Sequence, residues 1–404
     1  MLFKLAWRNI WRNSRRSIIV IGSVVVGVIA LLLIDSLDNG FLNQMLFNQI
    51  SSNVAHIQIH KKGFNNNKKL QSFVPGAEKV DETLANEAHV KHFSKRVIAF
   101  GLLSSASNSS GIYIYGVNPG KEKFVSYIHQ FIVKGKYFTG GEREIVIGEK
   151  LARKLKVSLG DKVVALANTP SGSIGSEVFR VVGIFKTPNS EFDKIHIYIP
   201  IRTAQKMLDI GNNFHEYAII LDNYKNAKSV AADLKNKLDA GYEVFSYEDI
   251  LPLLLLQLDL FKEMMFIINL IVGLALIFGI INAMLMSVFE RIQEIGVLMS
   301  IGMKNIKIFL MIVFEAIILG VSGTILGIIL GYALTQTLAV YGIDLSIFSD
   351  SLTSFGVGSI IYPILSLDNL IVTLFMIPFV SVIGAIYPAI KAIRLEPVNA
   401  IRYI

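Results

Sequence analysis

The sequence contains no cysteine, few charged residues and only two tryptophans. The lack of cysteine excludes disulfides and any zinc or iron–sulfur site with thiolate ligands, although it does not decide the redox compartment. Asp, Glu, Lys and Arg make up 17% of the 404 residues and hydrophobic residues 52%, and the mean hydropathy is +0.53. The composition is too apolar for a soluble chain and too mixed for one made only of membrane helices. It therefore predicts several membrane spans together with one large soluble domain.

The sequence also lacks the common catalytic motifs. It has no H-E-x-x-H, no G-x-S-x-G and no Walker A motif, so we predict that the chain is not an enzyme, has no catalytic residues and hydrolyses no nucleotide. His56 and His60 share one face of a predicted strand but lie about 13 Å apart at strand rise, too far to chelate one metal. His89 and His92 fit one helical turn, but no third ligand accompanies them. We predict no metal site and no cofactor bound by this chain.

The net charge of +8 comes partly from basic residues that stand beside apolar runs. The first 16 residues contain five of them: Lys4, Arg8, Arg12, Arg15 and Arg16. This placement is typical of a membrane topology signal, so we predict a membrane partner and no nucleic acid. An amphipathic helix in the headgroup region is expected, with an apolar side formed largely by Phe3, Trp7, Ile10 and Trp11.

Four apolar segments are long enough to cross a bilayer. They are residues 17–34, residues 264–289, a segment from about 308 to beyond 332, and residues 370–390. A cleavable signal peptide is an alternative for the first segment, because 28–30 loosely fits a cleavage site. The apolar run continues to Ile34, which favours a retained span. A single long helix is expected from Tyr247 to Phe289, with its outer third above the bilayer.

Between residues 35 and 262 no apolar run is long enough to span a membrane. Short β-branched or alternating segments there predict strands at 54–60, 96–103, 112–117, 144–147, 163–167, 178–185 and 195–199. Helices are predicted at 149–155, 202–210 and 226–238. The predicted fold class is an α-helical membrane protein with four transmembrane helices plus a large α+β extracytoplasmic domain inserted between helices 1 and 2.

A charged, glycine-punctuated segment, residues 289–316, separates the second span from the third. Ile292, Ile295 and Met299 form an apolar stripe at helical spacing, and Gly302 is suited to end the helix. We predict a short helix that lies along one membrane face and presents a surface to a soluble partner. The alternative is an ordinary connection whose charges are only solvated.

The segment ERIQEIGVLMSIGMKNIKIFLMIVFEA resembles the one that follows the second membrane helix in the MacB/FtsX-like permeases of ABC transporters. Tyr387-Pro388-Ala389 and the later Pro397 and Ala400-Ile401-Arg402 resemble the ending of the same permeases. YGVNPGKEK and VIGEKLARKLKVSLGDKV resemble the extracytoplasmic domain of the lipoprotein-releasing LolC/LolE branch. The chain is therefore identified as a member of this superfamily, most similar to that branch.

The resemblance implies an ATPase-coupling helix at 290–303. Its implied coupling residues are Glu290, Arg291, Glu294, Ile295, Gly296, Ser300 and Gly302. It further implies cytoplasmic ABC ATPase subunits that hold ATP and Mg, and a second permease chain, identical or a paralogue. The expected domains are 1–36 (amphipathic helix and first span), 37–262 (extracytoplasmic domain, with an inserted lobe at about 100–200) and 263–404 (the remaining spans and the coupling helix).

In the LolC relative a protruding hook grips a periplasmic lipoprotein carrier. The corresponding segment here, Asn168 to Glu177, is shorter and rich in glycine and serine. We therefore expect a flexible hairpin tip, and an extracytoplasmic carrier stays open as a further partner.

Some residues within the spans have two interpretations. Glu315 is the one acid well inside a predicted span, and pairing with Arg291 or Lys304 is favoured over a role in an ion path. Asn269 and Asn282 are expected to form hydrogen bonds between helices. Glycines at four-residue steps in the third span predict a face for close helix packing: Gly323, Gly327 and Gly331.

Basic residues cluster near both termini and at 290–307, whereas 339–369 contain no Lys or Arg. The positive-inside rule then predicts that both termini and the helix at 290–307 lie in the cytoplasm. The resemblance implies a multi-pass protein of the bacterial inner (cytoplasmic) membrane.

The resemblance implies the transmembrane subunit of a type VII-like ABC transporter that extracts or releases lipoproteins or another amphiphile from the outer leaflet. The residues expected to line a vestibule for acyl chains are Leu33, Leu37, Leu256, Leu260, Met264 and Ile267. One alternative is a MacB/FtsX-like mechanotransmission subunit that drives efflux or a periplasmic or cell-wall partner. A membrane-tethered receptor is a second alternative, but it leaves the coupling segment without a purpose.

Overall fold

The computed structural model describes residues 2–12 and 14–394, apart from a few N-terminal side chains including those of Phe3, Lys4 and Arg16. The chain divides into two compact units. The first takes in the chain up to Leu42, Leu258–Asp344 and the chain from Ile360 onward. The second takes in Asn43–Gln257 and Leu345–Ser359. The expected domain 37–262 did not include residues 345–359, because their sequence adjoins the third span and carries no signal of the long-range contacts they make.

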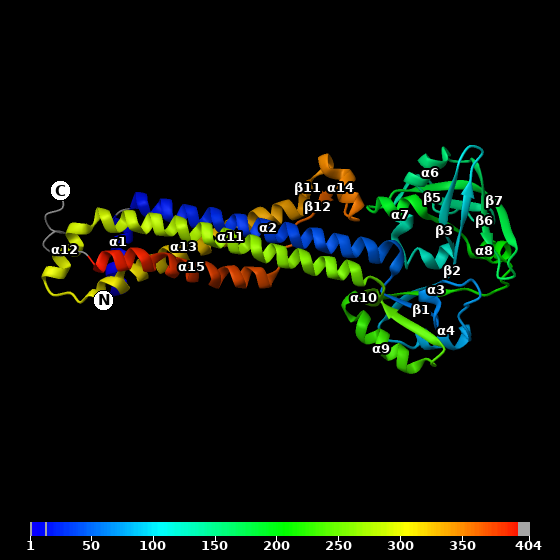
Figure 1. The fold of residues 1–404 in the computed structure, drawn as a ribbon, viewed down its shortest axis with the longest axis horizontal. Coiled ribbons are helices and arrows are strands. Elements are labelled where there is room, and N and C mark those ends of the chain that lie inside the picture. The colour runs from blue at the N-terminus through cyan, green and yellow to red at the C-terminus, as the bar shows by residue number, and fades with distance from the viewer. Residues whose placement is uncertain (1, 13, 395–404) are drawn as a thin grey trace. The chain divides into compact units, whose positions relative to one another are not determined.

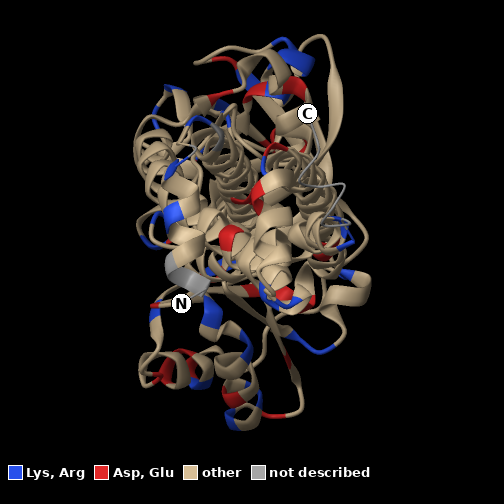
Figure 2. Ribbon diagram, turned by 90° about the vertical axis from the view of Figure 1, so that its left-hand side faces the viewer, with Lys and Arg blue, Asp and Glu red and all other residues tan. Residues whose placement is uncertain are grey.

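The first unit is built from helices. Its elements are α1 (Leu2–Arg12), α2 (Ser14–Gln49), α11 (Pro252–Glu290), α12 (Ile292–Ser300), α13 (Asn305–Tyr341), α15 (Leu367–Ile393) and the short hairpin β11 (Ile343–Asp344) and β12 (Ile360–Ile361). Four of the described helices, α2, α11, α13 and α15, are long and apolar enough to cross a membrane. Each contains an 18-residue window with at most two Asp, Glu, Lys or Arg residues. In the end-on view of Figure 2, most of the ribbon is tan, the colour of residues other than these four types. The four predicted spans are therefore confirmed as apolar helices, although α2 continues well past the predicted end at residue 34.

One predicted helix is interrupted. The prediction of a single helix from Tyr247 to Phe289 is wrong, because α10 (Tyr247–Ile250) ends before Leu251 and α11 begins at Pro252. Proline lacks an N–H group and disfavours helical geometry in the residue before it. Leu251 accordingly has φ −115° and ψ 46°.

Close packing between α13 and α2 depends on glycine. Three glycines of α13 face three apolar side chains of α2: Gly323 faces Val24, Gly327 faces Val28 and Gly331 faces Leu32. A Cβ atom at Gly327 would lie 2.7 Å from the Cβ of Val28, well inside van der Waals contact. Gly320 approaches Ser381 of α15 in the same way. These glycines let the helix backbones come closer than larger residues would permit.

The second unit is organised around one ten-stranded sheet (Figure 1). Its strands are β1 (Ile57–Lys61), β2 (Val90–Ser104), β3 (Ser109–Val117), β4 (Ile132–Gly135), β5 (Glu144–Gly148), β6 (Lys162–Asn168), β7 (Ile174–Phe185), β8 (His196–Pro200), β9 (Glu216–Leu221) and β10 (Tyr242–Ser246). They follow the order β10-β1-β9-β2-β3-β8-β5-β7-β4, and β6 pairs with β2 and β7. The pairs β3–β8 and β5–β7 are parallel and the others antiparallel. Strands from inside and outside the expected lobe at 100–200 thus belong to the same sheet.

Short helices surround the sheet. They are α3 (Phe64–Asn67), α4 (Ala77–Ala85), α5 (Pro119–Glu122), α6 (Glu149–Leu155), α7 (Ser190–Ile195), α8 (Ile201–Leu208), α9 (Ala227–Lys237), α10 and α14 (Ser349–Ser354). The predicted helices at 149–155, 202–210 and 226–238 are confirmed to within two residues. The strand predicted at 54–60 begins only at Ile57, because α2 continues as the π-helix η1 (Ile50–Val54). β4, β9 and β10 were not predicted from the sequence.

A buried arginine ties η1 to the sheet. Arg96 of β2 is 0% exposed, and its guanidinium contacts Glu122 at 2.6 Å and Glu216 at 2.9 Å. The same guanidinium donates a hydrogen bond to the backbone carbonyl of Asn53 in η1 at 2.5 Å. Burial would lower the pKa of Arg96, but the charges of the two glutamates outweigh it and raise the pKa above its ordinary value. The end of α2 is thus joined to three elements of the second unit through one charged side chain.

Candidate functional site

The segment between the second and third spans forms a separate short helix. α11 ends at Glu290, and Arg291 adopts φ −119° and ψ 20° before α12 begins at Ile292. Gly302 has φ +89°, a conformation that glycine adopts without a Cβ clash, and its N–H donates to the carbonyl of Met299 at 3.0 Å. The predicted helix, with a glycine that ends it, is therefore present.

α12 has an inward face that packs on the helical core. Ile292 and Ile295 are buried, Gly296 is buried beside them, and Met299 packs partly against the same core. Ile292, Ile295 and Met299 are the predicted apolar stripe. Burying it stabilises the helix by roughly 1.5–3 kcal/mol for each large side chain.

The outward face combines charged, polar and apolar side chains. Glu290, Glu294, Ser300 and Gly302 are exposed, whereas Arg291, Ile295 and Gly296 are turned wholly or largely inward. Two apolar residues that the sequence analysis did not select, Val297 and Ile301, also lie exposed, and Ile301 is 74% exposed. We call the exposed set the α12 surface: Glu290, Gln293, Glu294, Val297, Ser300, Ile301 and Gly302. The predicted coupling residues therefore separate into surface residues and residues that hold the helix in place.

Charged side chains fasten α12 to two other helices. Arg291 donates to Glu294 at 3.0 Å and contacts Glu315 of α13 at 3.4 Å, and Glu315 is only 1% exposed. Glu294 also pairs with Arg12 of α1. Of the two pairings proposed for Glu315, the one with Arg291 is confirmed. Burial would raise the pKa of Glu294, but hydrogen bonds from Arg12 and Arg291 outweigh this effect and lower the pKa. Glu294 is therefore anionic at neutral pH.

The residues expected to line a vestibule differ in exposure. Leu256, Leu260, Met264 and Ile267 of α11 are exposed large hydrophobic residues. Leu33 and Leu37 of α2 are half-buried. On α11 the expected residues thus present apolar surface that no other part of the described chain covers.

Other polar residues have clear partners. Asn269 of α11 donates to Asp35 of α2 at 2.9 Å, which confirms its predicted hydrogen bond between helices.

The histidines considered as metal ligands have separate partners. His89 contacts Asp222 at 3.2 Å, whereas the ring of His92 stacks on Phe124 at 4.8 Å. Within residues 2–12 and 14–394 no group of three metal-ligating side chains converges.

The segment that corresponds to the hook forms a tight hairpin. β6 and β7 pair from Lys162↔Arg180 to Asn168↔Ile174. The N–H of Thr169 donates to the carbonyl of Ser173 at 2.8 Å, and Gly172 has φ +87°. The predicted hairpin is present.

At the C-terminus, Tyr387 and Pro388 lie in α15, whereas Pro397 and Ala400 to Arg402 lie outside the described residues.

Two protein-family models match the chain. Residues 17–237 match the MacB-like periplasmic core domain, and residues 266–397 match the FtsX-like permease C-terminal model. The first match covers more than half of the chain. The two matches also reproduce the expected order of elements, in which the large domain follows the first span.

Several curated relatives are similar over most of the chain. The lipoprotein-releasing system transmembrane protein LolC of Xylella fastidiosa is 26% identical over 71% of this chain and 72% of its own length. LolC of Neisseria meningitidis serogroup B is 23% identical over 97% of this chain and 96% of its own length. The macrolide export ATP-binding/permease protein MacB of Acinetobacter baylyi is 24% identical over 99% of this chain but only 59% of its own length.

Proposed function

Since the chain belongs to the MacB/FtsX-like family, with a MacB-like periplasmic core domain followed by an FtsX-like permease part, we propose that it is the permease subunit of an ABC transporter. In this proposal separate cytoplasmic ATPase subunits bind ATP and Mg and dock on the α12 surface. The main support for this proposal is the pattern of buried and exposed residues on α12. Its apolar stripe is buried and Arg291 and Glu294 are paired with neighbouring helices, yet Val297 and Ile301 stay exposed between polar residues.

Such a surface fits a partner protein better than lipid or water. An exposed apolar pair inside a polar rim is the usual composition of a protein interface. Two of the fixing contacts run from Arg291 to Glu315 on α13 and from Glu294 to Arg12 on α1. A displacement of α12 would therefore act directly on α13 and α1, two helices of the first unit.

The docking proposal is tested by co-purification with the cognate ABC ATPase subunit. We expect Ile301→Asp and Glu294→Lys to reduce recovery of the ATPase at least tenfold, since each places a repulsive or unpaired charge in the interface. Gly296→Trp tests the supporting face, because Gly296 is buried and a tryptophan there would displace α12.

The matched control is Val340→Asp. Val340 is an exposed apolar residue at the other end of α13, 75% exposed, so its substitution adds the same charge without touching α12. Full recovery of the ATPase with Ile301→Asp and Glu294→Lys, at normal expression, would disprove docking on the α12 surface.

For the substrate we propose lipoproteins or another amphiphile of the outer leaflet. The exposed side chains Leu256, Leu260, Met264 and Ile267 support an apolar lining on α11 for acyl chains, together with Leu33 and Leu37 of α2. A second permease chain, identical or a paralogue, would complete such a vestibule. In this proposal both termini are cytoplasmic and the chain resides in a bacterial inner membrane.

The second candidate is a mechanotransmission subunit, which the similarity to a MacB protein supports. Here the extracytoplasmic domain would drive an efflux duct or a cell-wall enzyme and would move no lipid. ATP-dependent release of acylated peptides from nanodiscs separates the two. Acylation-dependent release supports the first candidate, whereas crosslinking of the domain to a duct or hydrolase supports the second.

A further inference from the structure

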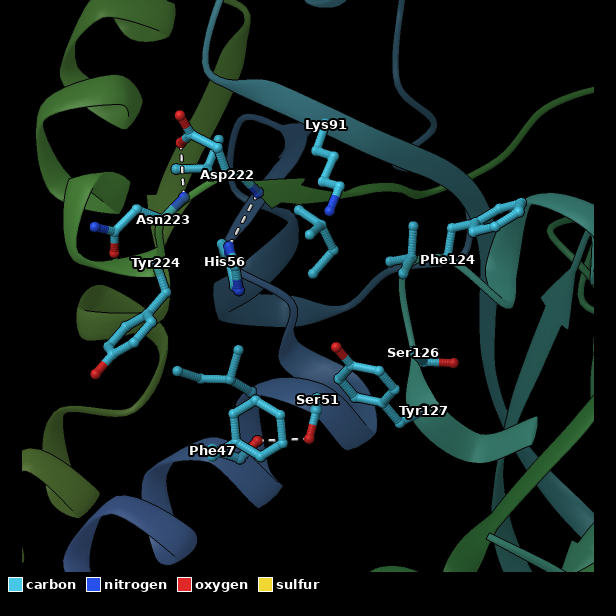
Figure 3. Close-up of a pocket in the computed structure, with 14 residues that line it drawn as sticks. Phe47, Ser51, His56, Lys91, Phe124, Ser126, Tyr127, Asp222, Asn223 and Tyr224 are labelled. Carbon is cyan, nitrogen blue, oxygen red and sulfur yellow. Dashed lines mark hydrogen bonds between the residues drawn. The ribbon is translucent and has the colours of Figure 1, made fainter. Parts of the chain in front are cut away.

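A cavity of about 250 Å³ opens within the second unit, beside the end of α2. It lies between η1, the C-terminal end of β9 and the segment that follows α5 (Figure 3). Its lining combines aromatic rings with a few polar groups, among them Phe47, Ser51, His56, Lys91, Tyr127 and Asp222. Ligand sites commonly combine an apolar wall with a few placed polar groups.

His56 presents a hydrogen-bond donor to the cavity. Its Nδ1 accepts a hydrogen bond from the N–H of Leu221 at 2.9 Å. Burial lowers the pKa of His56 to about 4, so the ring is neutral at neutral pH. A neutral imidazole that accepts at Nδ1 carries its proton on Nε2. That nitrogen is turned toward the open part of the cavity (Figure 3).

Lys91 supplies the positive charge. Its side chain extends from β2 and its ammonium group points into the cavity (Figure 3). Among the residues that the structure describes, no carboxylate forms an ion pair with Lys91. The carboxylate in the lining, Asp222, is occupied by the ring of His89 at 3.2 Å and by the N–H of Asn223 at 2.7 Å. The two available hydrogen-bond donors, the Lys91 ammonium group and the Nε2–H of His56, therefore favour an anion as the ligand.

Aromatic side chains form the walls. The rings of Phe47 and Tyr127 lie 5.7 Å apart, and those of His56 and Tyr224 lie 6.2 Å apart. Phe47 is 53% exposed and Tyr127 38% exposed, which is uncommon for aromatic residues in a folded domain. Covering them would bury apolar surface at about 25 cal/mol per Å², so an occupant with a ring or branched apolar body is favoured.

The backbone beneath the cavity is strained. η1 is a π-helix, and Ala55, which follows it, has φ +60° and ψ −172° without being a glycine. π-Helical turns and outlying backbone angles cost free energy and are concentrated at functional sites. Here they lie directly between Ser51 and His56, both of which line the cavity. The irregular backbone thus shapes the cavity.

We propose that this cavity binds a small apolar acid, a molecule with one ring or branched apolar group and one carboxylate or phosphate. The acidic group contacts Lys91 and the Nε2–H of His56, and the apolar group lies against the paired rings of Phe47 and Tyr127. Because Phe47 and Ser51 belong to α2 and η1, binding also stabilises this end of α2. The proposal does not depend on transport activity or on an ATPase.

The test uses the full chain in nanodiscs, without ATPase, and ligand-observed NMR titration. Phenylacetate should bind saturably and more tightly than acetate, which lacks the ring, and than phenethylammonium, which carries the opposite charge. Lys91→Met should weaken phenylacetate binding about tenfold or more, as for a lost charged hydrogen bond. Lys91→Glu should reverse the preference in favour of phenethylammonium. Phenyl phosphate as a further probe distinguishes a phosphate ligand from a carboxylate.

The control is Lys225→Met. It removes the same charge from an exposed lysine next to Tyr224 in sequence that does not line the cavity, so binding should be unchanged. Hydrogen exchange at residues 47–56 should slow on addition of phenylacetate in the wild type and in Lys225→Met only. The proposal is overturned if phenylacetate does not saturate, or if Lys91→Met and Lys225→Met bind it equally. Docking of the ATPase on α12 is measured separately, so either proposal can fail alone.

Discussion

Several ionisable side chains of the second unit are buried, and their environments set their charge. Burial lowers the pKa of His56 and His196 to about 4 and that of His60 to about 3. His60 lies 3.2 Å from Glu216, but at neutral pH it is uncharged and the contact is not an ion pair. Arg96 keeps its charge because two glutamates surround it. The buried histidines are thus neutral parts of the core, and protonating them in the folded chain would cost free energy.

We predict that these histidines destabilise the folded chain in acid. Between about pH 6.5 and pH 4 the unfolded chain binds protons at histidine that the folded chain does not, so the free energy of unfolding falls as the pH falls. At pH 5 each histidine would contribute up to about 2 kcal/mol. Asp193 has the opposite effect on the pH dependence. Burial raises its pKa to about 7, so its contribution to the free energy of unfolding is lost as the pH rises toward 7. A comparison between variants is therefore needed.

The measurement is thermal unfolding of the full chain between pH 7.5 and pH 5. His196→Phe replaces the imidazole that stacks on Phe192 with a phenyl ring and removes the titrating group. It also removes the hydrogen bond between Nδ1 and the Phe192 carbonyl, which lowers stability at every pH. The melting temperature should therefore fall less steeply with acid than that of the wild type. His89→Gln, at an exposed ring, leaves all the buried histidines in place and is the comparison variant. Identical slopes for wild type and His196→Phe would contradict the prediction.

At the level of single elements, α13 depends on small residues where it meets α2. The glycines at 323, 327 and 331 leave no room for a side chain, and the same helix carries Glu315, which anchors α12 through Arg291. α13 therefore connects the packing of the helical unit with the position of the α12 surface. A larger residue at one of these glycines should therefore disturb both the packing of the helical unit and the position of the α12 surface.

Gly327→Val should destabilise the helical unit by about 1–3 kcal/mol, because the added Cβ would lie 2.7 Å from the Cβ of Val28. Gly279→Val in α11 is the matched control, since a Cβ there meets nothing within 4 Å and both substitutions change helix propensity equally. Thermal unfolding in detergent compares the two. Equal loss of stability would show that close packing at Gly327 is not required.

For the molecule as a whole, membrane topology decides whether the proposed function is possible. The α12 surface must face the cytoplasm and the second unit the opposite side. The absence of native cysteine makes this directly testable with single-cysteine variants. Ile301 on α12, Lys225 near α9 and Ile347 before α14 are all exposed, and Ile347 is 93% exposed.

We predict that Lys225→Cys and Ile347→Cys react with a membrane-impermeant maleimide added to intact spheroplasts, and that Ile301→Cys reacts only after permeabilisation. The positive-inside distribution of Lys and Arg is the physical reason. Labelling after permeabilisation controls for reactivity at each site. Reaction of Ile301→Cys in intact spheroplasts would remove both the topology and the docking proposal.

The sequence by itself determined the four apolar helices, the short α12 with its buried stripe, and the family. These features depend on local signals: the length of an uncharged run, the 3.6-residue period, and a glycine at the end of a helix. The break before Pro252 has an equally local cause, the proline itself, but it was not predicted.

Only the tertiary structure decided which coupling residues face outward and which residues meet across the sheet. Arg96 contacts Glu216, 120 positions away, because the strand order places β9 beside β2. It contacts Glu122, 26 positions away, because α5 packs beside β2. The cavity likewise combines residues 47–56, 91, 124–127 and 220–224. Such contacts arise from long-range strand pairing and from the packing of whole elements, and neither leaves a periodic signal in a single sequence.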